Sequence, residues 1–160
     1  MVGSNNGLGR APDGDAEFAE RNSADLAWLR EGFAHAKAQN SRAIMILQQA
    51  NIFPEFPPFP GDTKRATGGF DDLRVALAKE AVAFGKPVVL VHGDSHYFRV
   101  DKPYMRLRTR PDEPAIENLT RLETFGTPNH HWVQVTTDTD DPNVFTFRPR
   151  IVAANVIRPR

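Results

Sequence analysis

The sequence predicts an α/β fold, in which a strand–helix–strand unit is extended by an antiparallel meander into one mixed sheet flanked by helices on one face. Two runs of consecutive apolar residues, 43–47 and 87–91, are typical of strands that are buried on both faces. Between them, residues 71–84 repeat apolar side chains every three or four positions, as an amphipathic helix does. Three short segments rich in Val, Thr and aromatic residues follow, as expected for antiparallel strands. We expect a single domain over residues 1–160.

The N-terminal part is predicted to be a loop followed by a helix. Residues 1–14 are rich in Gly, Asn and Pro, which favour turns. Residues 15–39 favour a helix, and a break near Asn22 is allowed because the serine after it can cap a second helix. Trp28 and Trp132 are interpreted as packing residues. The apolar stripe of this helix consists of Leu26, Leu29, Phe33 and Ala36.

The strand–helix–strand unit contains a long loop. After the first strand, residues 51–69 include four closely spaced prolines, which remove backbone donors and disfavour regular structure. The helix over 71–84 has two capping candidates, Asp71 and Asp72, and ends at Gly85. Because crossovers of this kind join parallel strands, the two apolar runs are predicted to lie parallel in one sheet.

The last third of the chain is predicted to form the meander. Its strands are expected over 119–125, 131–137 and 144–150, and turn-forming residues separate them at 126–129 and 138–143. Each strand is expected to pair with the next in the same mixed sheet.

Composition excludes several classes of function. The 160 residues include 20 basic and 20 acidic side chains, and this zero net charge argues against nucleic-acid and anionic-membrane partners. The absence of cysteine excludes disulfides, thiolate zinc sites and cysteine nucleophiles. No apolar run is long enough to span a bilayer, and the polar first residues lack the pattern of a signal peptide, so a cytoplasmic location is expected.

Polar side chains follow both strands of the predicted parallel pair. Gln48, Gln49 and Asn51 follow the first strand, and residues 92–96, His-Gly-Asp-Ser-His, end the second. Ligands of open α/β sheets bind at the carboxyl ends of the strands, where such residues meet. Imidazole and carboxylate suit Mn, Fe or Zn, so the sequence predicts a divalent transition-metal site here.

The order of these elements, together with Val89-Leu90-Val91-His92-Gly93-Asp94-Ser95-His96, resembles the C-terminal half of calcineurin-like metallophosphoesterases. In that family the corresponding strand ends in Gly-His-x-His, and an earlier strand ends in another metal-binding histidine. Gly93 and His96 match this motif, whereas Asp94 stands in place of the first histidine and Gln48 or Gln49 in place of the earlier one. The motifs of the family's N-terminal half do not precede Gln48, so the resemblance covers about residues 40–150 and half of a two-sheet sandwich.

This resemblance implies a metal-dependent phosphoesterase-like hydrolase domain that is incomplete alone. Asp94 and His96 are the candidate metal ligands, and His92 and His96 the candidate catalytic groups, since imidazole titrates near neutral pH. A small phosphoester is the expected substrate, with Gln49, Asn51 and Arg106 as candidate binding residues. A lone half would expose an apolar sheet face, so a homodimer is expected.

Two alternatives remain open. The first is a non-catalytic binding or scaffold domain derived from the same fold. The second is a serine esterase, because Gly93-Asp94-Ser95 after an apolar strand is similar to the nucleophile block of GDSL-type esterases. The chain lacks the Asp-x-x-His pair of those enzymes.

Overall fold

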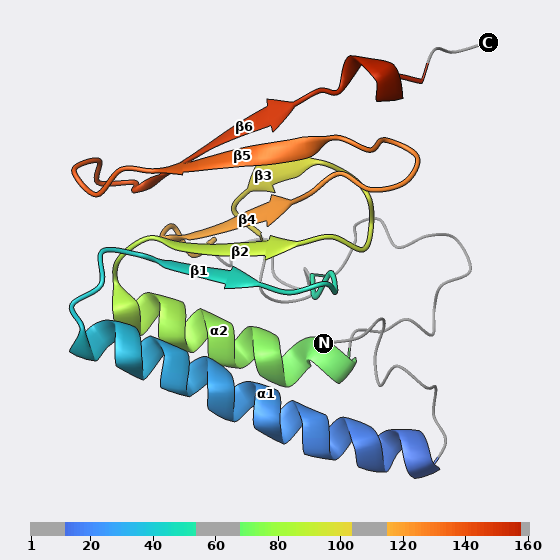
Figure 1. Ribbon diagram of the computed structural model, residues 1–160. Coiled ribbons are helices and arrows are strands. Elements are labelled where there is room, and N and C mark those ends of the chain that lie inside the picture. The colour runs from blue at the N-terminus through green and yellow to red at the C-terminus, as the bar shows by residue number, and fades with distance from the viewer. Residues whose placement is uncertain (1–11, 54–67, 104–114, 158–160) are drawn as a thin grey trace.

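Two helices cover one face of a four-stranded sheet, and a two-stranded hairpin lies on the side away from the helices (Figure 1). The computed structural model describes residues 12–53, 68–103 and 115–157. Along the chain, the elements are α1 (Pro12–Ala38), β1 (Ile44–Leu47), the short 3-10 helix η1 (Gly68–Phe70), α2 (Asp71–Phe84), β2 (Val88–His92), β3 (Arg99–Asp101), β4 (Leu119–Glu123), β5 (Trp132–Thr137), β6 (Phe145–Arg150) and the 3-10 helix η2 (Ala153–Asn155).

The parallel pair predicted from the two apolar runs is confirmed. β1 pairs with β2 in parallel, with Ile44 opposite Val88, and α2 connects them. α2 ends at Gly85, whose φ of 68° is a left-handed conformation that glycine adopts without steric cost.

The predicted meander in one sheet is wrong. β4 pairs in parallel with β2, and the three-residue β3, which was not predicted, pairs antiparallel with β4 at the edge. The sheet order is therefore β1-β2-β4-β3, while β5 and β6 pair only with each other. Periodicity identified the strands but carries no information on which partner a strand takes.

The main core lies between the helices and the sheet. Phe33 of α1 packs edge to face on Phe84 of α2, with ring centroids 6.0 Å apart. Side chains alternate between the faces of a strand, so Val88 and Leu90 point toward the helices and Val89 points toward the hairpin. All three valine and leucine side chains are buried.

Several boundaries and burial states differ from the sequence prediction. α1 begins at Pro12 and runs without a break at Asn22, which fits the preference of proline for the first turn of a helix. Ile52 and Phe53, at the start of the predicted loop, belong to the core. The described part of the remaining loop consists of η1, and residues 54–67 lie outside the described residues.

The tryptophan prediction is also wrong. Trp28 is 68% exposed on α1 and Trp132 is 54% exposed on β5. Trp28 lies off the stripe of α1 that contacts the core, because it directly precedes the buried Leu29.

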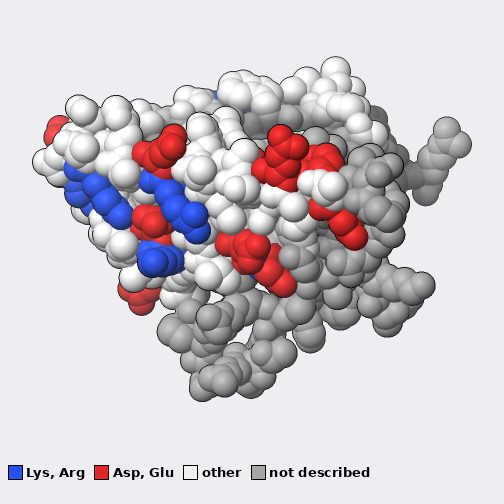
Figure 2. All heavy atoms as spheres, turned by 90° about the horizontal axis from the view of Figure 1, so that it is seen from below, with Lys and Arg blue, Asp and Glu red and all other residues white. Residues whose placement is uncertain are grey.

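Figure 2 shows the helical face, on which Lys and Arg gather toward the ends of the helices, with Asp and Glu both among them and toward the beginnings of the helices. α2 has Asp71 and Asp72 in its first turn, and α1 has His35 and Lys37 in its last. These side chains complement the helix dipoles.

Among the described residues, no helix is both long and apolar enough to cross a membrane.

Candidate functional site at the carboxyl ends of the parallel strands

The segments that follow β1 and β2 meet at one edge of the sheet. The Gly93 N–H donates to the Gln49 carbonyl at 3.2 Å, and the Asn51 N–H donates to Asp94 Oδ2 at 3.1 Å. The Asn51 amide also donates to Ser95 Oγ at 2.8 Å. The prediction that these polar segments lie together is confirmed, because parallel strands end at the same edge.

Asp94 is held by groups from the segment after β1. The Gln49 amide donates to Asp94 Oδ1 at 3.5 Å, in addition to the bond from the Asn51 backbone. Asp94 adopts a left-handed φ of 75°, a conformation that aspartate tolerates better than most residues. Each carboxylate oxygen has two lone pairs, so these bonds leave acceptor capacity for a further ligand.

His96 points toward the loop after β4. Its Nδ1 lies 2.8 Å from the Thr127 carbonyl oxygen. A carbonyl only accepts, so Nδ1 carries the proton and Nε2 presents its lone pair. The ring lies so close to Gly126 that a β-carbon at residue 126 would overlap its Cγ and Cδ2 atoms.

His92 lies beneath the surface on the helical side of the sheet. It is 1% exposed, its Nδ1 donates to the Gly93 carbonyl at 2.9 Å, and its buried Nε2 has no hydrogen-bond partner. The Phe53 ring packs against the imidazole. A catalytic group must reach the substrate, so this burial favours a structural role for His92 over the predicted catalytic one.

A buried ion pair, which was not predicted, adjoins His92. The carboxylate of Glu123, 0% exposed at the end of β4, accepts from Arg99 Nε at 2.6 Å. The Tyr97 N–H also donates to this carboxylate at 3.5 Å. Arg121, two residues before Glu123, pairs with Asp101 and stacks on Phe53. The spacing in the sequence could have indicated this burial, because Arg121 and Glu123 lie two and four residues after Leu119 and so share its inward face of β4.

Burial lowers the pKa of His92 below its ordinary value and is the largest effect on it. The hydrogen bond to Gly93 and the charge of Glu123 act in the opposite direction, while Arg121 and Arg99 lower the pKa further. The imidazole is therefore neutral in the folded chain near pH 7.

This pKa predicts a loss of stability in mild acid. The unfolded chain binds a proton at His92 below about pH 6.5, whereas the folded chain binds it only at lower pH. The free energy of unfolding is thus expected to fall as pH drops below about 6.5, and more steeply in the wild type than in His92→Gln. Urea unfolding of the metal-free protein between pH 7.5 and 5 measures the two slopes. His35→Gln, at an exposed position of α1, is the matched control, and equal slopes in all three proteins would contradict the assignment.

The donor chemistry of Asp94 and His96 fits a divalent transition metal in part. Histidine ligands commonly donate their second ring N–H to a backbone carbonyl, as His96 does to Thr127. Among residues 12–53, 68–103 and 115–157, however, no three His, Cys, Asp or Glu side chains are grouped as a metal site. Catalytic zinc sites use about three protein ligands, so Asp94 and His96 alone do not complete one.

The remaining predicted residues divide into two groups. Gln49 and Asn51 lie at the site, as described above. Arg106 lies outside the described residues. Gln48 donates to the Ala50 carbonyl at 2.8 Å, within its own segment.

Comparison with family models finds no match for this chain, and comparisons with curated proteins and with solved structures find none either.

Proposed function

We propose that this chain is a domain of a metal-dependent phosphoesterase-like hydrolase, similar to the C-terminal half of calcineurin-like metallophosphoesterases. The observation that carries the proposal is the junction of the segments after β1 and β2, where the Asn51 backbone holds the Asp94 carboxylate. This junction is at the edge where α/β folds bind their ligands.

In this proposal Asp94 and His96 hold a divalent transition metal, Mn, Fe or Zn. When bound, such an ion acidifies a water molecule and neutralises charge on a phosphoryl oxygen. Asn51 orients Ser95 and Asp94, Gln49 fixes the second carboxylate oxygen of Asp94, and both residues adjoin the place proposed for the phosphoester. Thr127 fixes the direction of the His96 ring.

Turnover by this chain alone is expected to be low. Two protein ligands bind a metal more weakly than the usual three and leave more of its coordination to water. For the isolated chain, this shortage favours binding of metal and phosphoester without rapid hydrolysis, which is the behaviour of the binding-domain alternative.

The serine-esterase alternative has less support. Among the described residues, Ser95 Oγ accepts a hydrogen bond from the Asn51 amide N–H, and an amide N–H cannot accept the proton of a nucleophile. An activated serine needs a neighbouring general base.

The homodimer remains a proposal with a smaller contact surface than first expected. The side of the sheet away from the helices was expected to be open, but Val89 and Leu122 on that side are buried. Leu47 of β1 and Ile151 and Ile157 after β6 remain exposed. A second copy can cover these side chains.

Metal binding tests the proposal directly. Wild type is expected to bind Mn²⁺ in a titration, and His96→Ala to bind it at least about tenfold more weakly, because one of two ligands is lost. Electron paramagnetic resonance of free Mn²⁺ during a titration measures both affinities. His35→Ala is the matched control, since it removes an exposed histidine from α1. Equal affinities of the wild type and His96→Ala would refute the assignment.

The same proteins separate the three classes of function. Hydrolysis of bis(p-nitrophenyl) phosphate that requires Mn²⁺ and His96 indicates a hydrolase, and metal binding without hydrolysis indicates a binding domain. Hydrolysis that resists chelators, with labelling of Ser95 by a fluorophosphonate, indicates a serine esterase instead.

A further inference from the structure

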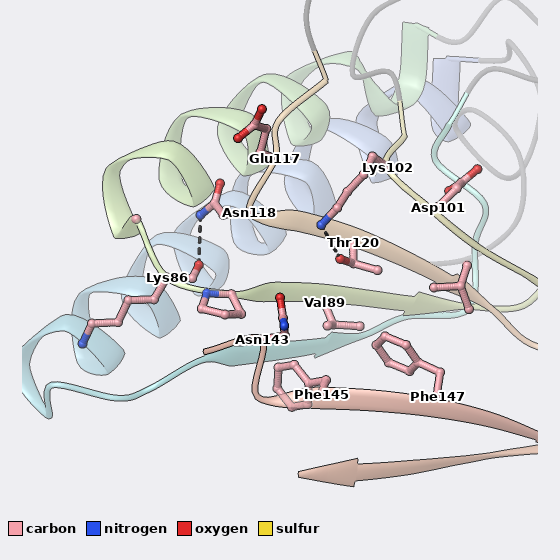
Figure 3. A pocket seen from close by; sticks show the side chains of 13 residues that line it. Lys86, Val89, Asp101, Lys102, Glu117, Asn118, Thr120, Asn143, Phe145 and Phe147 are labelled. Carbon is pink, nitrogen blue, oxygen red and sulfur yellow. Dashed lines mark hydrogen bonds between the residues drawn. The ribbon is translucent and has the colours of Figure 1, made fainter. Parts of the chain in front are cut away.

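A cavity of about 630 Å³ (Figure 3) lies beside the first residues of β2 and β4, whereas the candidate site follows the last residues of β1 and β2. It opens beside the first residues of β2 and β4 and the last residues of β3, and β6 of the hairpin forms its other wall. Its size is within the range of pockets that bind small molecules, about 300–1,000 Å³.

One wall of this cavity is aromatic. Phe145 and Phe147 alternate along β6, so both rings point to the same side, toward Val89 of β2 (Figure 3). Both phenylalanines are only half-buried, which leaves ring surface open to the cavity. Flat aromatic molecules stack on such surfaces more favourably than their buried area alone accounts for.

The cavity also holds a cationic group. The Lys102 ammonium points into it and donates to Thr120 Oγ1 at 2.8 Å (Figure 3). Among the ion pairs of the described residues, none involves Lys102. An ammonium has three N–H donors, so two remain for an anion after the bond to Thr120.

The other charged groups of the lining are engaged or directed elsewhere. Asp101 is paired with Arg121. Lys86 turns its ammonium out of the cavity to Asn40 and the Ser41 carbonyl. Glu117 points away from the phenylalanine rings (Figure 3). Lys102 is thus the charged side chain of this lining that points into the cavity without an ion-pair partner among the described residues.

We propose that this cavity binds a small planar aromatic anion, with the ring against Phe145 and Phe147 and the carboxylate on Lys102. The charge selects an anion, and the aromatic wall selects a flat apolar body. The cavity is independent of the proposed hydrolase function, because it shares no residue with the candidate site around Asp94 and His96.

Isothermal titration of the full chain with 2-naphthoate tests this site, with the neutral 2-naphthamide as its matched ligand. We expect naphthoate to bind and the amide to bind about tenfold more weakly or worse, because it makes no charge-assisted hydrogen bond. Lys102→Met, which keeps the aliphatic stem, is expected to reduce naphthoate affinity to that of the amide. Phe147→Leu, which removes the ring, is expected to weaken both ligands about equally.

Lys79→Met is the control, because it removes an exposed lysine from α2 on the other side of the sheet, and it should leave binding unchanged. The proposal is overturned if the wild type does not bind naphthoate at millimolar concentration, or if naphthoate and naphthamide bind equally. It is also overturned if Lys79→Met weakens binding as much as Lys102→Met does. If Lys102→Met does not fold, the comparison of the two ligands on the wild type decides.

Discussion

Replacing Arg99 with methionine is expected to destabilise the fold by about 3–5 kcal/mol, the range for breaking a buried ion pair by removing one partner. Arg99 donates to Glu123 at 2.6 Å, and the Glu123 carboxylate has no exposed surface. Without the guanidinium, this carboxylate either stays charged in the buried interior without its ion-pair partner or takes up a proton, and either outcome reduces stability near pH 7. Urea unfolding monitored by circular dichroism at pH 7 measures the loss.

Two further variants show whether the loss arises from the unpaired carboxylate. Arg30→Met removes an exposed arginine from α1 and is expected to change the free energy of unfolding by about 0.5 kcal/mol or less. Adding Glu123→Leu to Arg99→Met removes the orphaned charge and is expected to restore most of the stability. A loss below about 1 kcal/mol in Arg99→Met, or no recovery in the double variant, would argue that the pair is not a main determinant of stability.

Phe33→Ala is expected to have a comparable effect, about 3–5 kcal/mol. Phe33 is 1% exposed and is the α1 side chain that packs on Phe84, so its removal leaves a cavity between the helices. Trp28→Ala is the matched control, because it deletes a larger aromatic side chain five residues earlier that is 68% exposed. The control is expected to lose about 0.5 kcal/mol or less. Equal losses in the two variants would show that α1 does not pack on α2 as described.

The elements predicted correctly are those whose signals are local. β1, β2 and α2 are each specified by their own composition, and the conformational freedom of Gly85 marks the end of α2. The parallel pairing of β1 with β2 followed from the general handedness and layering of crossovers rather than from any pair of residues. The α/β class and the position of the helices on one face of the sheet could therefore be predicted from the sequence.

The failures depend on contacts between distant segments. β4 was expected to pair with the next strand of a meander, yet it lies inside the sheet, between β2 and β3. β3 has only three residues, too few for periodicity to reveal. Arg121 and Glu123 were overlooked because charged residues in a strand are usually exposed, and their partners come from β3.

The sequence predicted which segments meet at the candidate site, but not which of their side chains are exposed there. Parallel strands end at the same edge of a sheet, so Asn51 and Asp94 were expected to lie close together, and the hydrogen bond between them confirms this. The common edge does not determine which side of the sheet a terminal residue faces. His92 and Asp94 are two residues apart, but one is buried under Phe53 and the other is exposed.

The contact between the His96 ring and Gly126 makes the direction of an imidazole depend on a residue that has no side chain. Any larger residue at 126 would displace the ring while leaving His96 at its place in the chain. Deleting His96 removes the group and its orientation together, whereas enlarging residue 126 alters the orientation alone. A substitution at Gly126 therefore tests whether the role of His96 depends on the orientation of its ring or only on the presence of an imidazole at this edge of the sheet.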